Sequence, residues 1–152
     1  EEIAAYCENY DKLIEEAGGL DIQLLGIGRT GHIGFNEPGS EIGAPTRLIS
    51  LDYVTIADAA SDFYGEESVP RRAITMGVAT IMKAKRVLLL AIGEGKSAII
   101  KATIEGPVTS DIPATYLQKH PNALCLLDNA SSAELTRIKT PWLTTNVLFV
   151  VR

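Results

Sequence analysis

A glycine-rich segment, residues 26–39, restricts the fold of this chain more than any other stretch. It directly follows the apolar run 22–25, and its sequence is GIGRTGHIGFNEPG. Glycine tolerates positive φ angles and lets the backbone approach a ligand closely, whereas Pro38 keeps the preceding glutamate out of a helix. His32 and Glu37 are therefore expected on an irregular loop at the end of a strand. Such a placement is typical of an acid–base pair.

The start of this segment, residues 26–31, also matches the G-x-G-x-x-G pattern of dinucleotide-binding folds. Asp52 lies about twenty residues further on, where a ribose-binding acid is sought in such folds. In those folds, however, a helix begins within the pattern and continues beyond it. Pro38 and Pro45, together with the glycines between them, prevent a helix here. We therefore do not expect NAD binding.

A second segment, Gly95-Lys96-Ser97, resembles the end of a nucleotide-binding P-loop. The P-loop pattern requires a glycine where this chain has Leu90, which argues against a nucleotide site. The segment still places a lysine where a strand and a glycine turn lead into a predicted helix. Backbone N–H groups and the helix dipole favour an anion at a helix start, and Lys96 adds a full charge. The alternative is a solvated lysine, which is common on protein surfaces.

Apolar periodicity and turn residues predict alternating helices and strands. Helices are expected at 3–17, 52–63, 96–105, 112–118 and 130–135, and 74–84 combines a short extended start with a helix. Strands are expected at 20–25, 46–51, 86–92 and 123–127, while the tail 147–152 is either a last strand or a cut end. The apolar run 86–92 is typical of a parallel strand buried on both faces. The pattern predicts one α/β domain, residues 1–152, with a parallel sheet flanked by helices.

Composition narrows the partners that this chain can have. A net charge of −5 without a basic stripe argues against nucleic-acid binding. No apolar run is long enough for a membrane helix, and the first residues lack the basic region of a signal peptide. Cys7 and Cys125 have no metal-ligand spacing and are expected to be reduced and buried. These features predict a cytoplasmic protein.

His32 and Glu37 are residue types that could bind a metal ion. His32 and Glu37 do not have the helical H-E-x-x-H spacing, and no third ligand is evident from the sequence. His120 precedes Pro121 in a separate segment and is expected to be a structural or surface residue. We therefore expect neither a metal nor a cofactor.

Several of these segments resemble one known family. The run 24–39, LLGIGRTGHIGFNEPG, is very similar to the signature of the glucosamine-6-phosphate deaminases, the isomerase/deaminases of amino-sugar catabolism. Further similar segments follow in the same order, at 46–48, 69–77, 90–96 and 117–121. The related 6-phosphogluconolactonases do not usually have Gly-Phe-Asn-Glu-Pro after the histidine. The resemblance implies a Rossmann-like α/β sheet of the sugar-phosphate isomerase/deaminase type. It also implies conversion of glucosamine 6-phosphate and water into fructose 6-phosphate and ammonia, without a redox cofactor.

The resemblance further implies roles for single residues. His32 would be the acid–base residue that opens the sugar ring, and Glu37 would orient its imidazole and stabilise the positive charge. Lys96 would bind the phosphate of the substrate. The remaining implied substrate contacts come from the glycine-rich segment, where the backbone can approach a sugar: Gly26, Gly28, Gly31 and Thr30.

Three positions depart from the pattern of the family. Thr30 stands where many members carry an aspartate, and a hydroxyl can hydrogen-bond but brings no charge. Asp62 lies near the position of a phosphate-binding lid arginine. Arg47 matches a residue of an allosteric site described for some members, but Ile49 stands where that site has a lysine, so allosteric activation is not expected.

Members of the family also carry a segment before the region that resembles this chain, with a phosphate loop and the aspartate that removes the C2 proton. This chain is therefore expected to be the C-terminal half of a larger deaminase-like domain, incomplete at its N-terminus. Its sheet should have an unpaired edge. By itself it is expected to be inactive as a deaminase.

Two other functions stay open from the sequence. One is a non-catalytic module that binds a sugar phosphate and regulates another protein. The other is a hydrolase of the 6-phosphogluconolactonase type on the same fold. In each case the expected partner is a small sugar phosphate, and the chain could assemble as a homo-oligomer.

Overall fold

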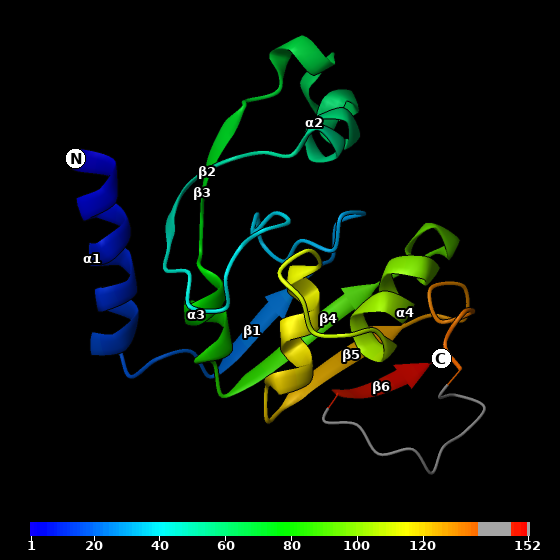
Figure 1. Ribbon diagram of the computed structural model, residues 1–152. Coiled ribbons are helices and arrows are strands. Elements are labelled where there is room, and N and C mark those ends of the chain that lie inside the picture. Colours follow the sequence, from blue (N-terminus) through cyan, green and yellow to red (C-terminus); the bar gives the residue numbers. More distant parts are fainter. Residues whose placement is uncertain (137–146, 152) are drawn as a thin grey trace.

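The computed structural model describes residues 1–136 and 147–151, and shows a parallel sheet with helices against one of its faces (Figure 1). The strand order is β1-β4-β5-β6, and every neighbouring pair is parallel. The strands are Ile22–Leu25 (β1), Arg86–Ala91 (β4), Ala123–Leu127 (β5) and Val147–Val151 (β6). The predicted α/β class with a parallel sheet is confirmed, and the tail forms a strand over residues 147–151; residue 152 lies outside the described residues.

Helices form in most of the predicted ranges, and two of these ranges differ from the prediction in helix type. The α-helices are Glu2–Glu16 (α1), Tyr53–Ala59 (α2), Val78–Met82 (α3) and Ser97–Glu105 (α4). The 3-10 helices are Ala60–Phe63 (η1), Glu66–Ser68 (η2), Glu94–Lys96 (η3) and Pro113–Lys119 (η4). Asp52 caps α2, because its side chain accepts a hydrogen bond from the backbone N–H of Val54 at 2.8 Å. The expected helices at 52–63 and 112–118 therefore exist, but each is partly or wholly of the 3-10 type.

The prediction of a helix at 130–135 is wrong, because residues 129–134 form turns. The Asp128 carboxylate accepts the backbone N–H of Ser131 at 2.8 Å, and the Ser132 hydroxyl donates to the Asp128 carbonyl at 2.8 Å. The Ser131 hydroxyl donates to the carbonyl of Ala91, at the end of β4. Side chains of this kind compete with helical backbone hydrogen bonds, and here they hold the turn against the sheet.

A separate antiparallel pair carries α2 away from the sheet. It is formed by β2 (Arg47–Ser50) and β3 (Arg72–Thr75), paired in register. We call residues 47–75 the arm; in Figure 1 it rises above the ends of β1 and β4 and carries α2 at its tip. The strand expected at 46–51 thus exists but does not belong to the parallel sheet. Residues along β2 alternate between exposed and half-buried, as in a ribbon that is solvated on one side.

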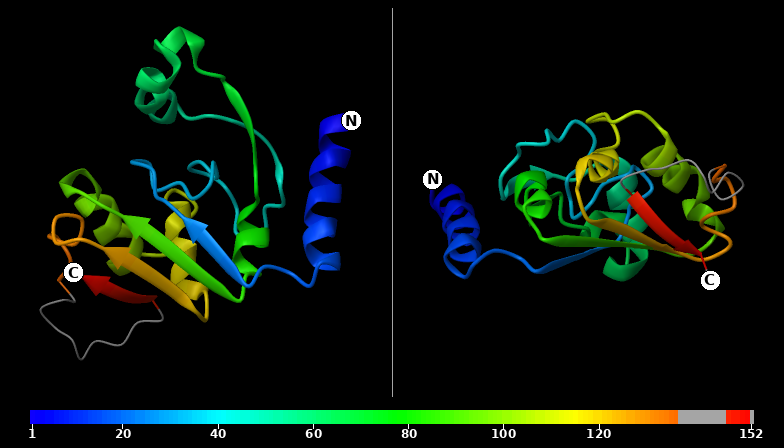
Figure 2. Two further views of the ribbon diagram at one scale, coloured as in Figure 1. Left: turned by 180° about the vertical axis from the view of Figure 1, so that it is seen from behind. Right: turned by 90° about the horizontal axis from the view of Figure 1, so that it is seen from below.

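The core lies on one face of the parallel sheet. Val87, Leu89 and Cys125 point into it and are fully buried beneath α3, α4 and η4, which all lie on this side (Figure 2, right). The alternate residues of β4 face the other way, and Leu90 is 37% exposed. The expectation that strand 86–92 is buried on both faces is therefore wrong for the described residues, because helices cover one face only.

The first helix and the first strand lie at the open edge of the sheet (Figures 1 and 2). In the described part of the chain, β1 pairs with β4 alone, as expected for a sheet with an unpaired edge. Ile22 and Leu24 on β1 are 58% and 60% exposed. Part of the apolar stripe of α1 is also exposed, with Tyr6 61% and Leu13 54% exposed, whereas Cys7 is buried.

Both cysteines are free and buried, as expected from the sequence. Burial raises the pKa of the Cys125 thiol to about 12, so this thiol stays protonated and unreactive near neutral pH. Within the described residues, no helix is both long and apolar enough to cross a membrane.

Candidate active site at the glycine loop

The glycine-rich segment forms a compact loop at the carboxyl end of β1. The backbone N–H of Gly28 donates to the carbonyl of His32 at 3.1 Å, and that of Gly31 donates to Gly28 at 3.0 Å. Gly31 has a φ of +80° and Gly34 a φ of +58°, which favour glycine. No helix forms between this loop and β2, as the prolines predicted, and the geometry is not that of a dinucleotide-binding fold.

The loop brings His32 and Glu37 into direct contact. Nδ1 of His32 lies 3.1 Å from Oε2 of Glu37, and the two side chains are only 15% and 10% exposed. Thr30 completes the cluster: its hydroxyl lies 3.0 Å from the same Nδ1 and donates to Oε2 of Glu37 at 3.3 Å. An ionised carboxylate can only accept, so the contact with Glu37 requires the proton on Nδ1. In the neutral imidazole, Nε2 is then the nitrogen that can act as a base.

The glycine at position 28 makes room for the imidazole. A Cβ atom at Gly28 would lie 2.2 Å from Cε1 and 2.3 Å from Nε2 of His32. A Cβ at Gly31 would lie 2.5 Å from Ile112, whereas nothing lies within 4 Å of the corresponding position at Gly26. Of the three glycines expected to approach a sugar, Gly26 alone borders open space, and the other two allow close packing within the protein.

Lys96 reaches the same loop from the neighbouring strand. Because β1 and β4 are parallel, their carboxyl ends lie at one edge of the sheet, where ligands of open α/β sheets bind. The ammonium of Lys96 donates to the carbonyl of Ile27 at 2.8 Å. The structure thus places the ammonium of Lys96 against the loop that carries the His32–Glu37 pair.

A carboxylate of the chain itself occupies part of the turn before α4. The backbone N–H of Gly93 donates to both oxygens of Asp128, at 3.1 and 3.2 Å. Hydrogen bonds from Ser131 and from Gly93 lower the pKa of Asp128 below its ordinary value. An anion held at this turn would therefore depend on the charge of Lys96 rather than on the N–H of Gly93.

Two further residues of the site were not found from the sequence. Asn36 is fully buried and fixes the loop, because its side-chain amide donates to the carbonyls of Ile33 at 2.8 Å and Met76 at 2.9 Å. Thr55 on α2 is 7% exposed, and its hydroxyl lies 3.3 Å from Nδ1 of His32. Asparagine within a glycine-rich loop is a weak signal, and no local pattern connects position 55 with position 32.

The other candidates lie elsewhere. His120 is fully buried and structural: its Nε2 lies 2.7 Å from the carbonyl of Ala84, and its Nδ1 accepts the backbone N–H of Asn122 at 3.0 Å. Asp62 is exposed on η1 in the arm. Among the residues that the structure describes, no three histidine, cysteine or acidic side chains come together in a way that could hold a metal ion.

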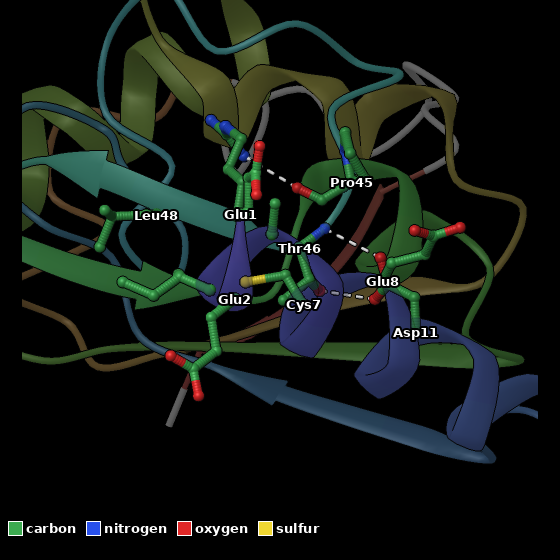
Figure 3. A pocket seen from close by; sticks show the side chains of 11 residues that line it. Glu1, Glu2, Cys7, Glu8, Asp11, Pro45, Thr46 and Leu48 are labelled. Carbon is green, nitrogen blue, oxygen red and sulfur yellow. Dashed lines mark hydrogen bonds between the residues drawn. The ribbon is translucent and has the colours of Figure 1, made fainter.

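A groove of about 830 Å³ lies between α1 and β2, away from the loop (Figure 3). Its lining includes Cys7, Asp11, Thr46 and Arg47, and it contains neither the histidine–glutamate pair of the loop nor Lys96. Figure 3 shows Asp11 directed toward Thr46. This groove is a separate feature of the α1 side.

Arg47, which borders that groove, directs its guanidinium toward the glycine loop. It donates to the side-chain oxygen of Asn36 at 2.8 Å and to the hydroxyl of Ser40 at 2.8 Å. Burial lowers the pKa of this guanidinium from its ordinary value. In the described structure Arg47 therefore braces the loop that carries His32.

The fold and this loop together define an α/β protein with a buried histidine–carboxylate pair at the carboxyl edge of its parallel sheet. The model of the family described as glucosamine-6-phosphate isomerases/6-phosphogluconolactonase matches residues 1–126, and the chain belongs to this family. A glucosamine-6-phosphate deaminase of Cellvibrio japonicus is 48% identical over 135 residues, which cover 89% of this chain and 51% of that protein. A glucosamine-6-phosphate deaminase-like protein of Bacteroides thetaiotaomicron is 52% identical over 144 residues, which cover 95% of this chain and 22% of that protein.

Solved structures agree with this assignment. A monomeric glucosamine-6-phosphate deaminase superposes with a TM-score of 0.83 at 41% identity, over 86% of this chain and 54% of that one. A 6-phosphogluconolactonase from Trypanosoma cruzi superposes with a TM-score of 0.64 at 21% identity, over 86% of this chain and 51% of that one, and is a likeness of fold alone. The chain spans about half the length of the deaminases that it matches.

Proposed function

We propose that this chain supplies the acid–base histidine loop of an amino-sugar-phosphate deaminase. The observation that carries the proposal is the contact between Nδ1 of His32 and Glu37 at 3.1 Å, which leaves Nε2 as the base on a loop that Lys96 also reaches. Identities of 48–50% with several glucosamine-6-phosphate deaminases support the same chemistry. The 6-phosphogluconolactonases are similar in fold only.

The proposed reaction converts glucosamine 6-phosphate and water into fructose 6-phosphate and ammonia. His32 would exchange a proton with the ring oxygen through Nε2 while Glu37 keeps the second proton on Nδ1 and stabilises the imidazolium. Lys96 would bind the phosphate, and Gly26 would border the sugar. We propose that the 152-residue chain does not complete this reaction by itself, because it spans about half the length of the deaminases that it matches.

The proposed partner is a small sugar phosphate and not a nucleic acid or a membrane, in keeping with the net charge of −5 and its scattered basic residues. We infer a cytoplasmic location and no cofactor, as for an enzyme of sugar-phosphate metabolism. Assembly as a homo-oligomer would be measured directly by sedimentation.

Binding is the first test of the proposal. Calorimetry with glucosamine 6-phosphate should show one site on the 152-residue chain. Lys96→Ala should weaken binding by about ten- to a hundredfold, which is the range for a lost hydrogen bond to a charged group. Lys85→Ala is the matched control, because it removes the same charge from the opposite end of β4, where Lys85 pairs with Asp21. Equal affinity of the Lys96→Ala and parent chains would reject the phosphate role.

Catalysis is tested in a chimera in which residues 1–126 replace the matching half of the Cellvibrio japonicus deaminase. The chimera should release ammonia from glucosamine 6-phosphate, and His32→Ala should lower the rate by about two to four orders of magnitude. Hydrolysis of 6-phosphogluconolactone instead would favour the lactonase alternative. Substrate binding without either reaction would favour the non-catalytic sugar-phosphate-binding module.

A further inference from the structure

The helix of the arm contacts the glycine loop through one of its sides. Asp52 and Thr55 are three residues apart and therefore neighbours on the helix surface. The backbone N–H of Asp52 donates to Oε1 of Glu37 at 3.2 Å, and the hydroxyl of Thr55 lies 3.3 Å from Nδ1 of His32. Both residues of the candidate acid–base pair are thus contacted from the arm as well as from their own loop.

A third contact continues the same side of the helix. Asp58, three residues beyond Thr55, forms a bidentate ion pair with Arg29, with Nε to Oδ2 at 2.9 Å and Nη2 to Oδ1 at 2.6 Å. The paired side chains are 58% and 44% exposed, so this pair lies at the rim of the contact. Thr55, at 7% exposure, lies at its buried centre.

The hydrogen-bond inventory at Nδ1 of His32 gives Thr55 a chemical role. Thr30 donates its hydroxyl proton to Glu37, so its oxygen remains free to accept from Nδ1. Thr55 offers a second hydroxyl oxygen on the same nitrogen, but from a different element of the fold. Among the described residues, all hydrogen-bonding neighbours of the imidazole lie at Nδ1, and the ring as a whole lies against Gly28.

We propose that Thr55 is a positioning residue for His32: by accepting from Nδ1 beside Glu37 and Thr30, its hydroxyl makes docking of α2 strengthen the preference that Glu37 sets for the tautomer in which Nε2 is the base. A catalytic role for this tautomer rests on the proposed function. The effect of Thr55 on the tautomer itself can be measured on the chain without substrate. The position of the arm and the readiness of the imidazole for proton transfer are then linked through one buried hydroxyl.

The chain contains its own reference for the test. Nε2 of His120 faces the Ala84 carbonyl, and Nδ1 accepts from Asn122, so His120 must carry its proton on Nε2. The two histidines of the sequence should therefore show opposite tautomers in ¹⁵N spectra of the neutral imidazoles. Only the tautomer of His32 should respond to changes in the arm.

The experiment compares the parent chain with Thr55→Val and Thr55→Ser by ring-¹⁵N NMR. Thr55→Val should lower the ratio of Nδ1–H to Nε2–H at His32 by about three- to tenfold, as expected for one lost hydrogen bond. Thr55→Ser should restore the ratio to within about twofold of the parent, because it keeps the hydroxyl. An unchanged ratio in Thr55→Val, or an Nε2–H tautomer of His32 in the parent chain, would overturn the proposal.

A further variant, Thr55→Ala, keeps the test decisive if valine at position 55 displaces α2 from the loop. Backbone amide shifts of residues 52–63 report whether the helix stays docked, and Thr55→Ala removes the hydroxyl without adding bulk. A parent-like ratio in a docked Thr55→Ala chain also overturns the proposal. In the chimera, Thr55→Val should lower kcat with KM unchanged. Failure of the chimera to release ammonia rejects the proposed function but leaves the tautomer result standing, so the two failures are distinguishable.

Discussion

Two sides of this molecule differ in how far other elements of the chain cover them. On the closed side, α3, α4 and η4 cover one sheet face, and the arm docks onto the glycine loop through paired polar groups (Figures 1 and 2). On the open side, the free edge of β1 and part of the apolar stripe of α1 are exposed, and the side chains of the other sheet face range from half-buried to exposed. Polar contacts within a loop need only a few nearby residues. An apolar sheet face needs a whole layer of helices to cover it, and the described residues form such a layer on one of the two faces.

Neighbouring leucines of β4 give the largest predicted difference between the two sides. Leu89 is fully buried, so Leu89→Ala should lower the free energy of unfolding by about 2–5 kcal/mol, through lost burial and a new cavity. Leu90 is 37% exposed on the other face, and Leu90→Ala should cost at most about 1 kcal/mol. Urea unfolding of both variants measures this. Equal losses would mean that the open face is covered in solution.

Two glycines of the loop, Gly28 and Gly26, differ in how closely other atoms pack around them. Gly28→Ala places a Cβ against the imidazole of His32 and should cost about 1–3 kcal/mol of stability, as overpacking does. Gly26→Ala meets no atom within 4 Å and should change stability by less than about 1 kcal/mol. Thermal unfolding of the two variants measures both changes in stability. If Gly26→Ala keeps its stability but loses affinity for the sugar phosphate, Gly26 borders the substrate as proposed.

The carboxylate of Asp11 on α1 should make the stability of the fold depend on pH. Burial raises the pKa of Asp11, but hydrogen bonds from Thr46 and Thr80 outweigh burial and hold the pKa below its ordinary value. A lowered folded-state pKa contributes stability above the unfolded value of about 3.9, and this is lost as pH falls through the folded pKa. Asp11→Asn should therefore cost about 1–2 kcal/mol at pH 7 and progressively less toward the acid limit.

The matched control for Asp11 is Asp21, whose pKa is lowered by its hydrogen bond and ion pair with Lys85 on the exposed surface. Solvent screens such a pair, so Asp21→Asn should leave stability unchanged at either pH. A difference between parent and Asp11→Asn that persists undiminished under acid conditions would show that the carboxylate charge is not the cause.

The smallest predicted effect is at the rim of the arm. Arg29 and Asp58 are both more than 40% exposed, so a double-mutant cycle with Arg29→Ala and Asp58→Ala should give a coupling of about 0.2–1 kcal/mol. High salt should reduce this coupling further. A coupling above about 2 kcal/mol would place the pair in a desolvated contact and would make it a main determinant of arm docking.

Local features of the fold could be predicted from the sequence because their causes are local. Gly18 and Gly19 end α1 with positive φ angles, and the N–H of Gly19 donates to the carbonyl of Ile14 at 2.8 Å. The parallel strands follow from apolar runs separated by helices. The expectation for residues 130–135 was wrong, because hydrogen bonds to Asp128 and Ala91 replaced those of a helix.

The candidate site was predictable in part for the same reason. His32 and Glu37 are five residues apart on one loop, so their contact needs no long-range information. Lys96 reaches that loop because parallel strands end at one edge of the sheet. Thr55 was not predictable, because its contact with His32 spans 23 positions and depends on how the arm folds back.

By itself, the sequence determined the glycine loop, its histidine–carboxylate pair and the alternation that makes a parallel sheet. These depend on backbone freedom at glycine, on helix breakers and on apolar spacing, all of which act over a few residues. The tertiary structure alone decided which sheet face is covered and which hydroxyl of the arm meets the imidazole. Those outcomes depend on the relative placement of elements far apart in the chain, which no local pattern encodes.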